Sequence, residues 1–211
     1  MITNLSINNL KLHDHTDLVL NGLTILTGMN GMGKSTVIQS LILLRQSFMM
    51  NDLDSGLNLK GDLCDAGISG ELACQASTEH TLNINMKFAE QDDLNFSFEY
   101  PDNIMDTMLP GMEGNVTSKA VLSKYSLFNE KFQYLSAFRF GPQKSYNRDT
   151  SLVATKKQVS KIMGQCEYAV HFLEQYKNLN IPIEELAIID KEDITPDYRL
   201  AVQVERWLRL V

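Results

Sequence analysis

The sequence predicts an α/β fold in which a mixed sheet carries an antiparallel β-meander. A short β-rich apolar run at residues 23–27 leads into a glycine-rich turn, and the apolar stretch at residues 37–44 that follows is typical of a buried helix. Three segments of alternating apolar and polar residues come later, at 68–76, 81–88 and 94–100. Their connections are too short for crossover helices, which favours antiparallel pairing.

Two further strands are expected before the glycine-rich turn. Residues 2–7 alternate loosely between apolar and polar side chains, and residues 17–20 form a brief apolar run. Asn21-Gly22 is a strong turn signal between this run and the next one. The glycine-rich turn therefore follows the third predicted strand and not the first. This placement helps to distinguish between the classes of protein that contain such a turn.

The glycine-rich turn fits the pattern Gly, four residues, Gly-Lys-Ser, over Gly28-Met29-Asn30-Gly31-Met32-Gly33-Lys34-Ser35-Thr36. A strand, such a turn and a helix N-terminus form a phosphate cradle, because backbone N–H groups converge on the phosphate oxygens and the helix dipole favours their charge. Lys34 is predicted to be catalytic by reaching the β- and γ-phosphates, and the Ser35 hydroxyl is predicted to ligate Mg²⁺. The motif as a whole predicts nucleotide binding.

The remaining elements follow from local patterns. We expect a helix from Ser35 to about Met50, and a long mobile loop at residues 101–118, which is rich in proline and glycine. The other expected elements are a buried strand at 132–138, a polar surface loop at 144–165, and helices at 166–176, 183–189 and 196–211.

Composition excludes several classes of protein. The net charge of −7 argues against a generally basic, nucleic-acid-coating surface. The cysteines, Cys64, Cys74 and Cys166, are widely spaced and odd in number, which favours reduced thiols in a cytoplasmic protein over a disulfide framework. The N-terminus shows no secretory signal pattern, and the apolar runs are too short to span a bilayer. We expect a cytoplasmic protein with no membrane partner.

Other phosphate-loop classes lack parts that they require. A GTPase needs Asp-x-x-Gly and Asn-Lys-x-Asp, and neither pattern occurs. A small-molecule kinase, the alternative reading, usually begins with the phosphate-loop strand and closes its site with an arginine-rich lid. Here two strands precede the loop, and a β-meander is foreign to a kinase core. A second alternative is a nucleotide-gated interaction module without turnover.

The arrangement resembles the N-terminal lobe of ABC-type ATPases, in the SMC, RecF and Old-like branch of AAA-family ATP-binding proteins. The resemblance rests on residues 5–11 and on the narrow form Gly-x-Asn-Gly-x-Gly-Lys-Ser-Thr at residues 28–36; weaker patches lie at 41–47, 59–63 and 134–142. It implies ATP and Mg²⁺ as cofactors, and a homodimer in which the partner protomer's signature motif completes each ATP site. The branch hosts DNA repair and phage defence, so a DNA or nuclease partner is implied by analogy alone.

The resemblance also directs attention to residues outside the loop. It makes Gln143, after the 132–138 strand, a candidate Mg²⁺ contact, with a solvated loop glutamine as the equal alternative. Arg139 is a candidate phosphate or partner contact, with a surface ion pair as the slightly favoured alternative. The best Walker B candidate ends at Asp190, but Lys191 and not Glu follows it, so a helix-terminal carboxylate is the expected role. Lys11, His13 and His15 precede the second strand, where related ATPases place groups near the nucleotide. We expect the histidines to be exposed loop residues, with zinc ligation as the less favoured alternative.

We expect residues 1–211 to form a single P-loop ATPase N-terminal lobe that is incomplete, because no signature motif or full Walker B segment is found in it. Within the lobe we assign residues 1–56 to the strands, loop and helix that bind nucleotide, and 57–131 to the β-meander and mobile loop. Residues 132–211 are assigned to a core strand followed by helices.

Overall fold

A computed structural model of the chain describes residues 1–89, 91–137, 141, 143–161, 163–189 and 195–210. The chain divides into two compact units, Met1–Tyr134 and Leu135–Val211. The first unit holds the glycine-rich loop, and the fold around that loop is built from one sheet and one long helix.

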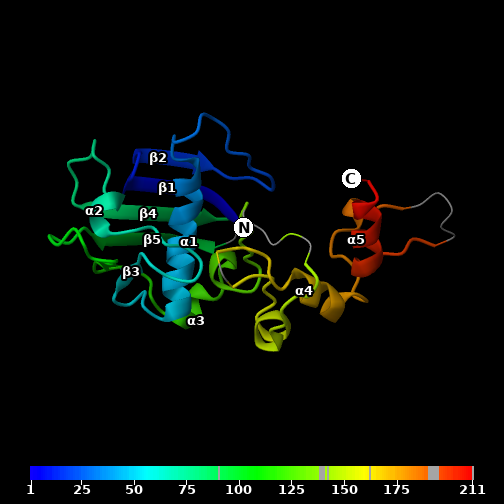
Figure 1. Cartoon of the computed structure of the whole chain (residues 1–211). Coiled ribbons are helices and arrows are strands. Elements are labelled where there is room, and N and C mark those ends of the chain that lie inside the picture. The colour runs from blue at the N-terminus through cyan, green and yellow to red at the C-terminus, as the bar shows by residue number, and fades with distance from the viewer. Residues whose placement is uncertain (90, 138–140, 142, 162, 190–194, 211) are drawn as a thin grey trace. The chain divides into compact units, whose positions relative to one another are not determined.

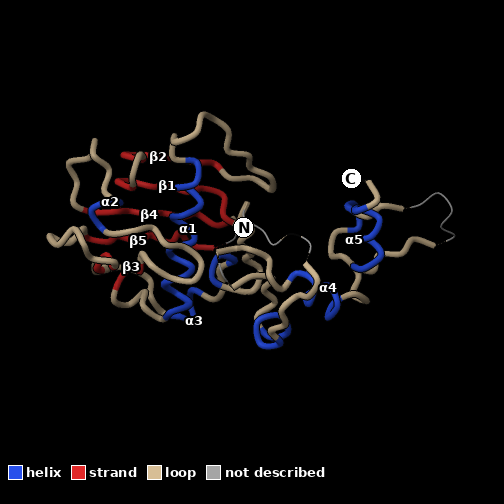
Figure 2. Tube along the Cα trace, in the orientation of Figure 1, coloured by secondary structure: helices blue, strands red, loops and turns tan. Residues whose placement is uncertain are grey.

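The sheet of the first unit has the strand order β2-β1-β4-β5 (Figures 1 and 2). Its strands are β1 (Ile2–Leu10), β2 (His13–Val19), β4 (Thr81–Phe88) and β5 (Gln91–Glu99). Neighbouring strands pair antiparallel throughout. Strand β1 lies in the middle of the sheet although it comes first in the chain, because the hairpin β4–β5 adds to the edge of β1 that β2 leaves free.

The two faces of this sheet differ in polarity, as the period of two residues in a strand requires. Leu5 and Ile7 of β1 are buried, whereas Ser6 and Asn8, which alternate with them, are partly exposed. In the neighbouring strands the buried residues are Leu82, Ile84 and Met86 of β4 and Leu94, Phe96 and Phe98 of β5. One apolar face of the sheet therefore supplies half of the core.

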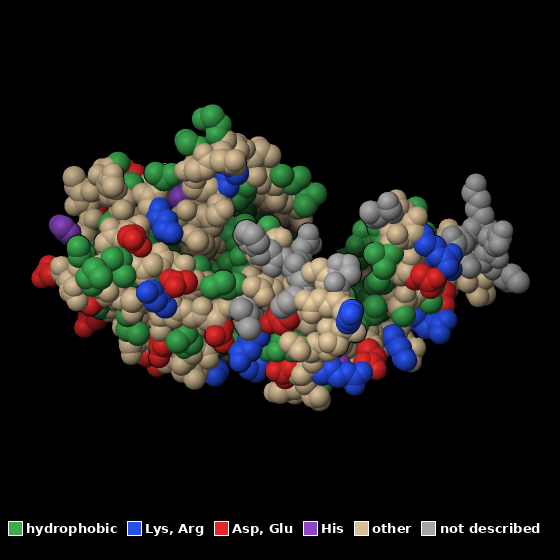
Figure 3. Space-filling view, in the orientation of Figure 1, with side chains coloured by type: hydrophobic (Ala, Val, Ile, Leu, Met, Phe, Trp, Pro, Cys, Tyr) green, Lys and Arg blue, Asp and Glu red, His purple; other side chains and the backbone are tan. Residues whose placement is uncertain are grey.

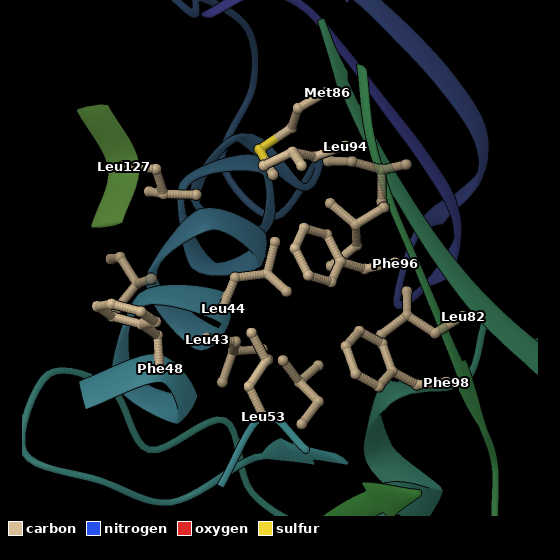
Figure 4. Close-up of a cluster of buried hydrophobic side chains, with 14 of the residues drawn as sticks. Leu43, Leu44, Phe48, Leu53, Leu82, Met86, Leu94, Phe96, Phe98 and Leu127 are labelled. Atoms are coloured by element: carbon tan, nitrogen blue, oxygen red, sulfur yellow. The ribbon is translucent and has the colours of Figure 1, made fainter. Parts of the chain in front are cut away.

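Helix α1 (Lys34–Met50) supplies the other half. It runs across the strands in Figure 1, and Leu43, Leu44 and Phe48 lie opposite Phe96 and Phe98 in Figure 4. The ring of Phe48 lies 5.1 Å from that of Phe128 in the 3₁₀ turn η1 (Ser126–Phe128), and the Phe128 ring lies 6.2 Å from that of Phe96 in β5. The helix that begins at the glycine-rich loop is thus anchored in the core.

Residues 42–48 of α1 are all buried, so the polar side chains among them need partners inside the protein. Gln46 donates to the Asn58 carbonyl and accepts from the Cys64 amide. The Arg45 guanidinium donates to the Leu127 carbonyl at 3.0 Å and lies over the Phe132 ring. Burial lowers the pKa of Arg45 to about 10, which leaves it charged at neutral pH.

Short elements cover the rest of the first unit. Strand β3 (Gly56–Asn58) pairs antiparallel with β6 (Met108–Pro110), and the helices α2 (Ser69–Leu72) and α3 (Lys119–Leu122) lie in the connections. Strand β6 falls within the expected loop at 101–118, and Leu109 of β6 is fully buried. The segment expected to be a mobile loop therefore contains a short strand, and one side chain of that strand belongs to the core.

The second unit is mostly helical. It contains the π-helical turn η2 (Ser151–Thr155), helix α4 (Ala169–Tyr176), the 3₁₀ turn η3 (Glu184–Leu186) and helix α5 (Leu200–Leu208). The expected helices at 166–176 and 196–211 are present as the shorter α4 and α5. The expected surface loop at 144–165 instead contains η2, whose Leu152 and Val153 are buried.

Three expected strands or helices are wrong in the described residues. Residues 68–76 do not join β4, because β1 and β5 occupy both edges of that strand; the amides of Ser69 and Gly70 bond to the carbonyls of Asp106 and Ile104 instead. Residues 132–137 form no strand. The helix expected at 183–189 is reduced to η3, since the Gln203 side chain binds both backbone groups of Ile188.

The expected mixed sheet is not observed either, because the segment at 23–27 pairs with no strand among the described residues. It follows β2 without a ladder, and Leu23 and Ile25 are 79% and 72% exposed. Only Leu26 of this segment packs against the core.

The described surface is mixed in charge. On the face shown in Figure 3, Lys and Arg side chains lie interspersed with Asp and Glu. None of the described helices has the length and apolar character that crossing a bilayer requires.

Candidate functional site

The glycine-rich loop has a backbone that only its glycines adopt easily. Gly28, Gly31 and Gly33 have φ angles of 139°, 81° and 82°, in the region that L side chains rarely occupy. A Cβ at Gly28 or Gly31 would meet no atom within 4 Å, so the space beside these residues is open. The loop is an exposed concave turn of backbone that a ligand can approach closely.

Helix α1 begins directly after this loop, with Gly33 as its N-cap residue. The Gly33 carbonyl accepts from the amides of Thr36 at 2.9 Å and Val37 at 3.3 Å, which closes the first turn. No side chain caps this N-terminus, and its first turn carries no acidic residue. The first amides of a 17-residue helix are therefore available to an anion, and the helix dipole favours one there.

The Lys34 ammonium lies over the same loop. Its Nζ donates to the carbonyl oxygens of Gly28 at 2.7 Å and Met29 at 2.6 Å. The cation is thus held at the mouth of the loop by backbone atoms and has no acidic partner among the salt bridges of the described residues. Ser35 is exposed at the start of α1, whereas Thr36 is buried.

His13 lies beside the loop, in the region where the resemblance places groups near the nucleotide, but its contact with the loop is not predicted from the sequence. Its Nε2 lies 3.0 Å from the Gly33 carbonyl oxygen, and its Nδ1 lies 2.8 Å from the Thr16 hydroxyl. We expected an exposed loop residue, but His13 is partly buried at the first position of β2. No local pattern could have found this contact, because it depends on how the β1–β2 hairpin lies against α1.

The other residues of that hairpin turn behave differently. His15 is exposed, as expected, and its ring contacts Asn8 and Asp17. The Lys11 ammonium donates to the Gln39 side chain of α1 at 3.2 Å, so it contacts the helix. Of these three residues, only His13 forms a hydrogen bond with the glycine-rich loop in the part of the chain that the structure describes.

An apolar cavity of about 430 Å³ lies beside the loop. The segment before the loop forms one part of its lining and the first turns of α1 another, and β1 contributes Leu5. Its lining residues are Leu5, Leu20, Thr24, Ile25, Leu26, Lys34, Ser35, Val37, Ile38 and Leu41. The side chains of Lys34 and Ser35 thus border both the loop and an apolar space.

The remaining sequence candidates form no hydrogen bond or ion pair with the loop among the described residues. Gln143 belongs to the second unit; it is exposed, and its backbone amide donates to the Tyr146 hydroxyl at 3.1 Å. Its role at a metal stays a prediction. Arg139 and Asp190 lie outside the described residues.

Taken together, open backbone amides, a lysine ammonium and an exposed serine hydroxyl can neutralise a polyphosphate and add an oxygen ligand to its metal ion. These groups fit a nucleoside phosphate with Mg²⁺, since the cradle is open where a phosphate would lie and holds no carboxylate in its first helical turn. Among curated proteins, none matches the chain significantly. A family model described as an AAA ATPase domain matches residues 1–201. That match covers nearly the whole chain, and AAA ATPase domains bind nucleotide; the chain therefore belongs to the AAA ATPase domain family.

Proposed function

We propose that residues Gly28–Thr36 bind ATP with Mg²⁺, and that the chain belongs to the SMC, RecF and Old-like branch of ATPases. The observation that carries the nucleotide site is the Lys34 ammonium, which lies 2.7 Å from the Gly28 carbonyl across a loop of open, positive-φ glycines. A cation in this position neutralises phosphate charge that the backbone amides alone would leave only partly compensated.

Each residue of the loop has a part in this proposal. The amides of Asn30, Gly31, Met32 and Gly33, and those of Lys34 and Ser35 at the start of α1, surround the phosphates. Lys34 Nζ leaves one of its loop carbonyls and binds the β- and γ-phosphate oxygens. The Ser35 hydroxyl is a ligand of Mg²⁺, which when bound offsets the charge of the triphosphate.

The branch assignment has its support in the loop sequence and in the elements before it. The antiparallel hairpin β1–β2 precedes the loop, as the resemblance implies. Its turn lies against α1 through the Lys11–Gln39 hydrogen bond. Within this branch we propose that a second protomer completes the ATP site, and that Gln143 contacts the metal in the assembled enzyme. The exposed Met29 and Met32 side chains of the loop are consistent with a surface that a partner covers.

The nucleotide site is tested by Lys34→Ala with Lys87→Ala as the matched control. Lys87 is an exposed residue of β4, and its ammonium lies 3.7 Å from Asp93. We expect Lys34→Ala to weaken Mg-ATP binding about 100-fold in calorimetry, because it removes charge-assisted hydrogen bonds to phosphate. Lys87→Ala should bind as the unaltered chain does, and equal affinities for the two variants would refute the site.

The dimer is tested separately by light scattering with and without Mg-ATP. We expect the molar mass to double only with nucleotide, and Lys34→Ala to abolish the change. A mass that stays monomeric at saturating Mg-ATP would leave the nucleotide site standing and remove the composite-site proposal. Measured turnover then separates an ATPase from a nucleotide-gated module.

The proposal extends to the cellular setting of the protein. The three cysteines are free, which is consistent with a reducing, cytoplasmic location. A role in DNA repair or phage defence, with a DNA or nuclease partner, rests on the branch assignment alone. Co-purification of nucleic acid or of a nuclease with the full-length protein tests it.

A further inference from the structure

The contact between His13 and Gly33 joins the sheet to the end of the glycine-rich loop. We propose that His13 is a positioning residue for phosphate binding: its Nε2–H holds the Gly33 carbonyl and so sets the peptide plane whose N–H faces the nucleotide. The inference rests on the proposed function, because it concerns the same site. His13 itself does not touch the phosphates in this proposal.

The protonation of the ring follows from its two partners. A carbonyl oxygen can only accept, so the 3.0 Å contact to Gly33 requires that Nε2 carry the hydrogen. In the neutral ring Nδ1 is then the acceptor, and the Thr16 hydroxyl, 2.8 Å away, is its donor. Thr16 therefore orients the ring so that its N–H points at Gly33.

The peptide bond between Gly33 and Lys34 links the carbonyl that His13 contacts to the N–H that faces the ligand. In a trans peptide the C=O of one residue and the N–H of the next point in opposite directions. The Gly33 carbonyl points down helix α1, where it accepts from the Thr36 and Val37 amides. The N–H of Lys34 consequently points outward from the helix N-terminus, and fixing the carbonyl fixes that donor.

The contact also leaves the loop little room to change shape. A Cβ at Gly33 would lie 2.6 Å from His13 Nε2, so the ring closely packs the glycine on this side. Gly33 has a φ of 82°, which is reachable for glycine but is one of several conformations open to it. The ring of His13 selects among these conformations. Thr16, which orients this ring, pairs with Ile7 in the sheet, so the His13 ring is held by a rigid element.

The test compares His13→Gln with His13→Asn, because the amide group of each new side chain takes the place of a different ring nitrogen. Glutamine places its amide nitrogen where Nε2 lies, and it can still donate to Gly33. Asparagine reaches only as far as Nδ1, so it can contact Thr16 but not the loop. The matched control is His15→Asn, since His15 lies two positions along the same strand and contacts Asn8 and Asp17 instead.

We would measure the Mg-ATP dissociation constant of each full-chain variant by calorimetry, beside Lys34→Ala and the unaltered chain. We expect His13→Asn to bind Mg-ATP about tenfold more weakly, because the hydrogen bond to the Gly33 carbonyl is lost and the Lys34 N–H is no longer held toward the phosphate. His13→Gln should stay within about threefold of the unaltered chain, and His15→Asn should be unchanged. Rescue by Gln but not by Asn is a result that loss of general stability does not produce.

Several results would overturn the inference. If His13→Asn binds as well as the unaltered chain while Lys34→Ala does not, the positioning role is wrong and the nucleotide site stands. If His13→Gln is as weak as His13→Asn, the hydrogen bond is not the cause. If Lys34→Ala also binds normally, the proposed function fails and this inference with it.

A second variant covers the case in which His13→Asn does not fold, as judged by circular dichroism. Thr16→Val keeps the ring and removes only the hydroxyl that orients it. A folded Thr16→Val protein with about threefold weaker Mg-ATP binding supports the inference. Unchanged affinity in that variant overturns it.

Discussion

Nε2 of His13 lies 3.0 Å from the carbonyl oxygen of Gly33, although the two residues are 20 positions apart. One belongs to the first position of β2 and the other to the last glycine of the loop, so the contact ties a sheet strand to the N-cap of the helix that follows the loop. The loop is thereby braced at its helical end, while the sides of Gly28 and Gly31 remain open.

The first prediction concerns Gly33 itself. Gly33→Ala should destabilise the protein by about 1–3 kcal/mol, because alanine resists the positive φ. The new methyl group would also lie 2.6 Å from the His13 ring. Chemical denaturation measures the loss, and Mg-ATP affinity should fall with it. Gly22→Ala is the matched control: its Cβ would meet nothing within 4 Å, and its φ is not positive, so a comparable loss there would contradict this explanation.

The second prediction concerns the metal. Ser35→Ala should weaken ATP binding about tenfold in the presence of Mg²⁺ and leave it nearly unchanged in EDTA, because the hydroxyl is proposed to act through the metal ion. Ser35→Thr retains the hydroxyl and should behave as the unaltered chain does. A loss that is equal with and without Mg²⁺ would show that Ser35 acts on the phosphates directly or on the fold.

The third prediction concerns the bend that brings His13 to the loop. Asn9 is only 1% exposed; its amide nitrogen donates to the carbonyls of Glu79 and Thr81, and its oxygen accepts from the Cys74 amide. Asn9→Ala leaves the buried Cys74 amide without this acceptor and removes both bonds to the carbonyls of Glu79 and Thr81, so we expect a loss of about 2–4 kcal/mol in urea denaturation. Alanine also resists the φ of 59° that Asn9 adopts.

Asn95→Ala serves as the control for Asn9→Ala, since Asn95 is an exposed residue of β5. It should change the free energy of unfolding by less than about 0.5 kcal/mol. If the two variants lose similar stability, the buried network around Asn9 is not what holds the turn.

The loop and its helix could be predicted from the sequence because their determinants are local. Spacing of glycines in 28–33 indicates the backbone that the loop adopts, and the apolar pattern after Ser35 predicts α1 to within one residue of its observed start and end, Lys34 and Met50. Strands β1 and β4 are predicted by alternation, and β2 by a brief apolar run. β4 has the predicted ends, whereas β1 extends three residues further and β2 begins four residues earlier than predicted. Such patterns show that one face of a strand or helix is buried, and the residues of each segment determine that face without reference to other segments.

Pairing could be predicted only in part. β4 and β5 pair antiparallel, as expected, but the strand at the other edge of β4 could not be predicted, because an edge can be filled by only one strand. Residues 68–76 alternate as a strand does, yet β1 takes the edge of β4 that they would need. Residues 23–27 have the composition of a strand and find no partner among the described residues. A segment's pattern says that it can pair, and the competition among all segments decides whether it does.

The sequence by itself determined the glycine-rich loop, with the positions of Lys34 and Ser35 on it, since each depends on residues that are neighbours in the chain. Only the tertiary structure decided that His13 lies against Gly33. That contact depends on where the β1–β2 hairpin lies relative to α1, which is set by the packing of Leu5, Ile7 and Leu44 in one core. Packing of this kind is a property of the whole assembly of elements, and no single stretch of sequence carries it.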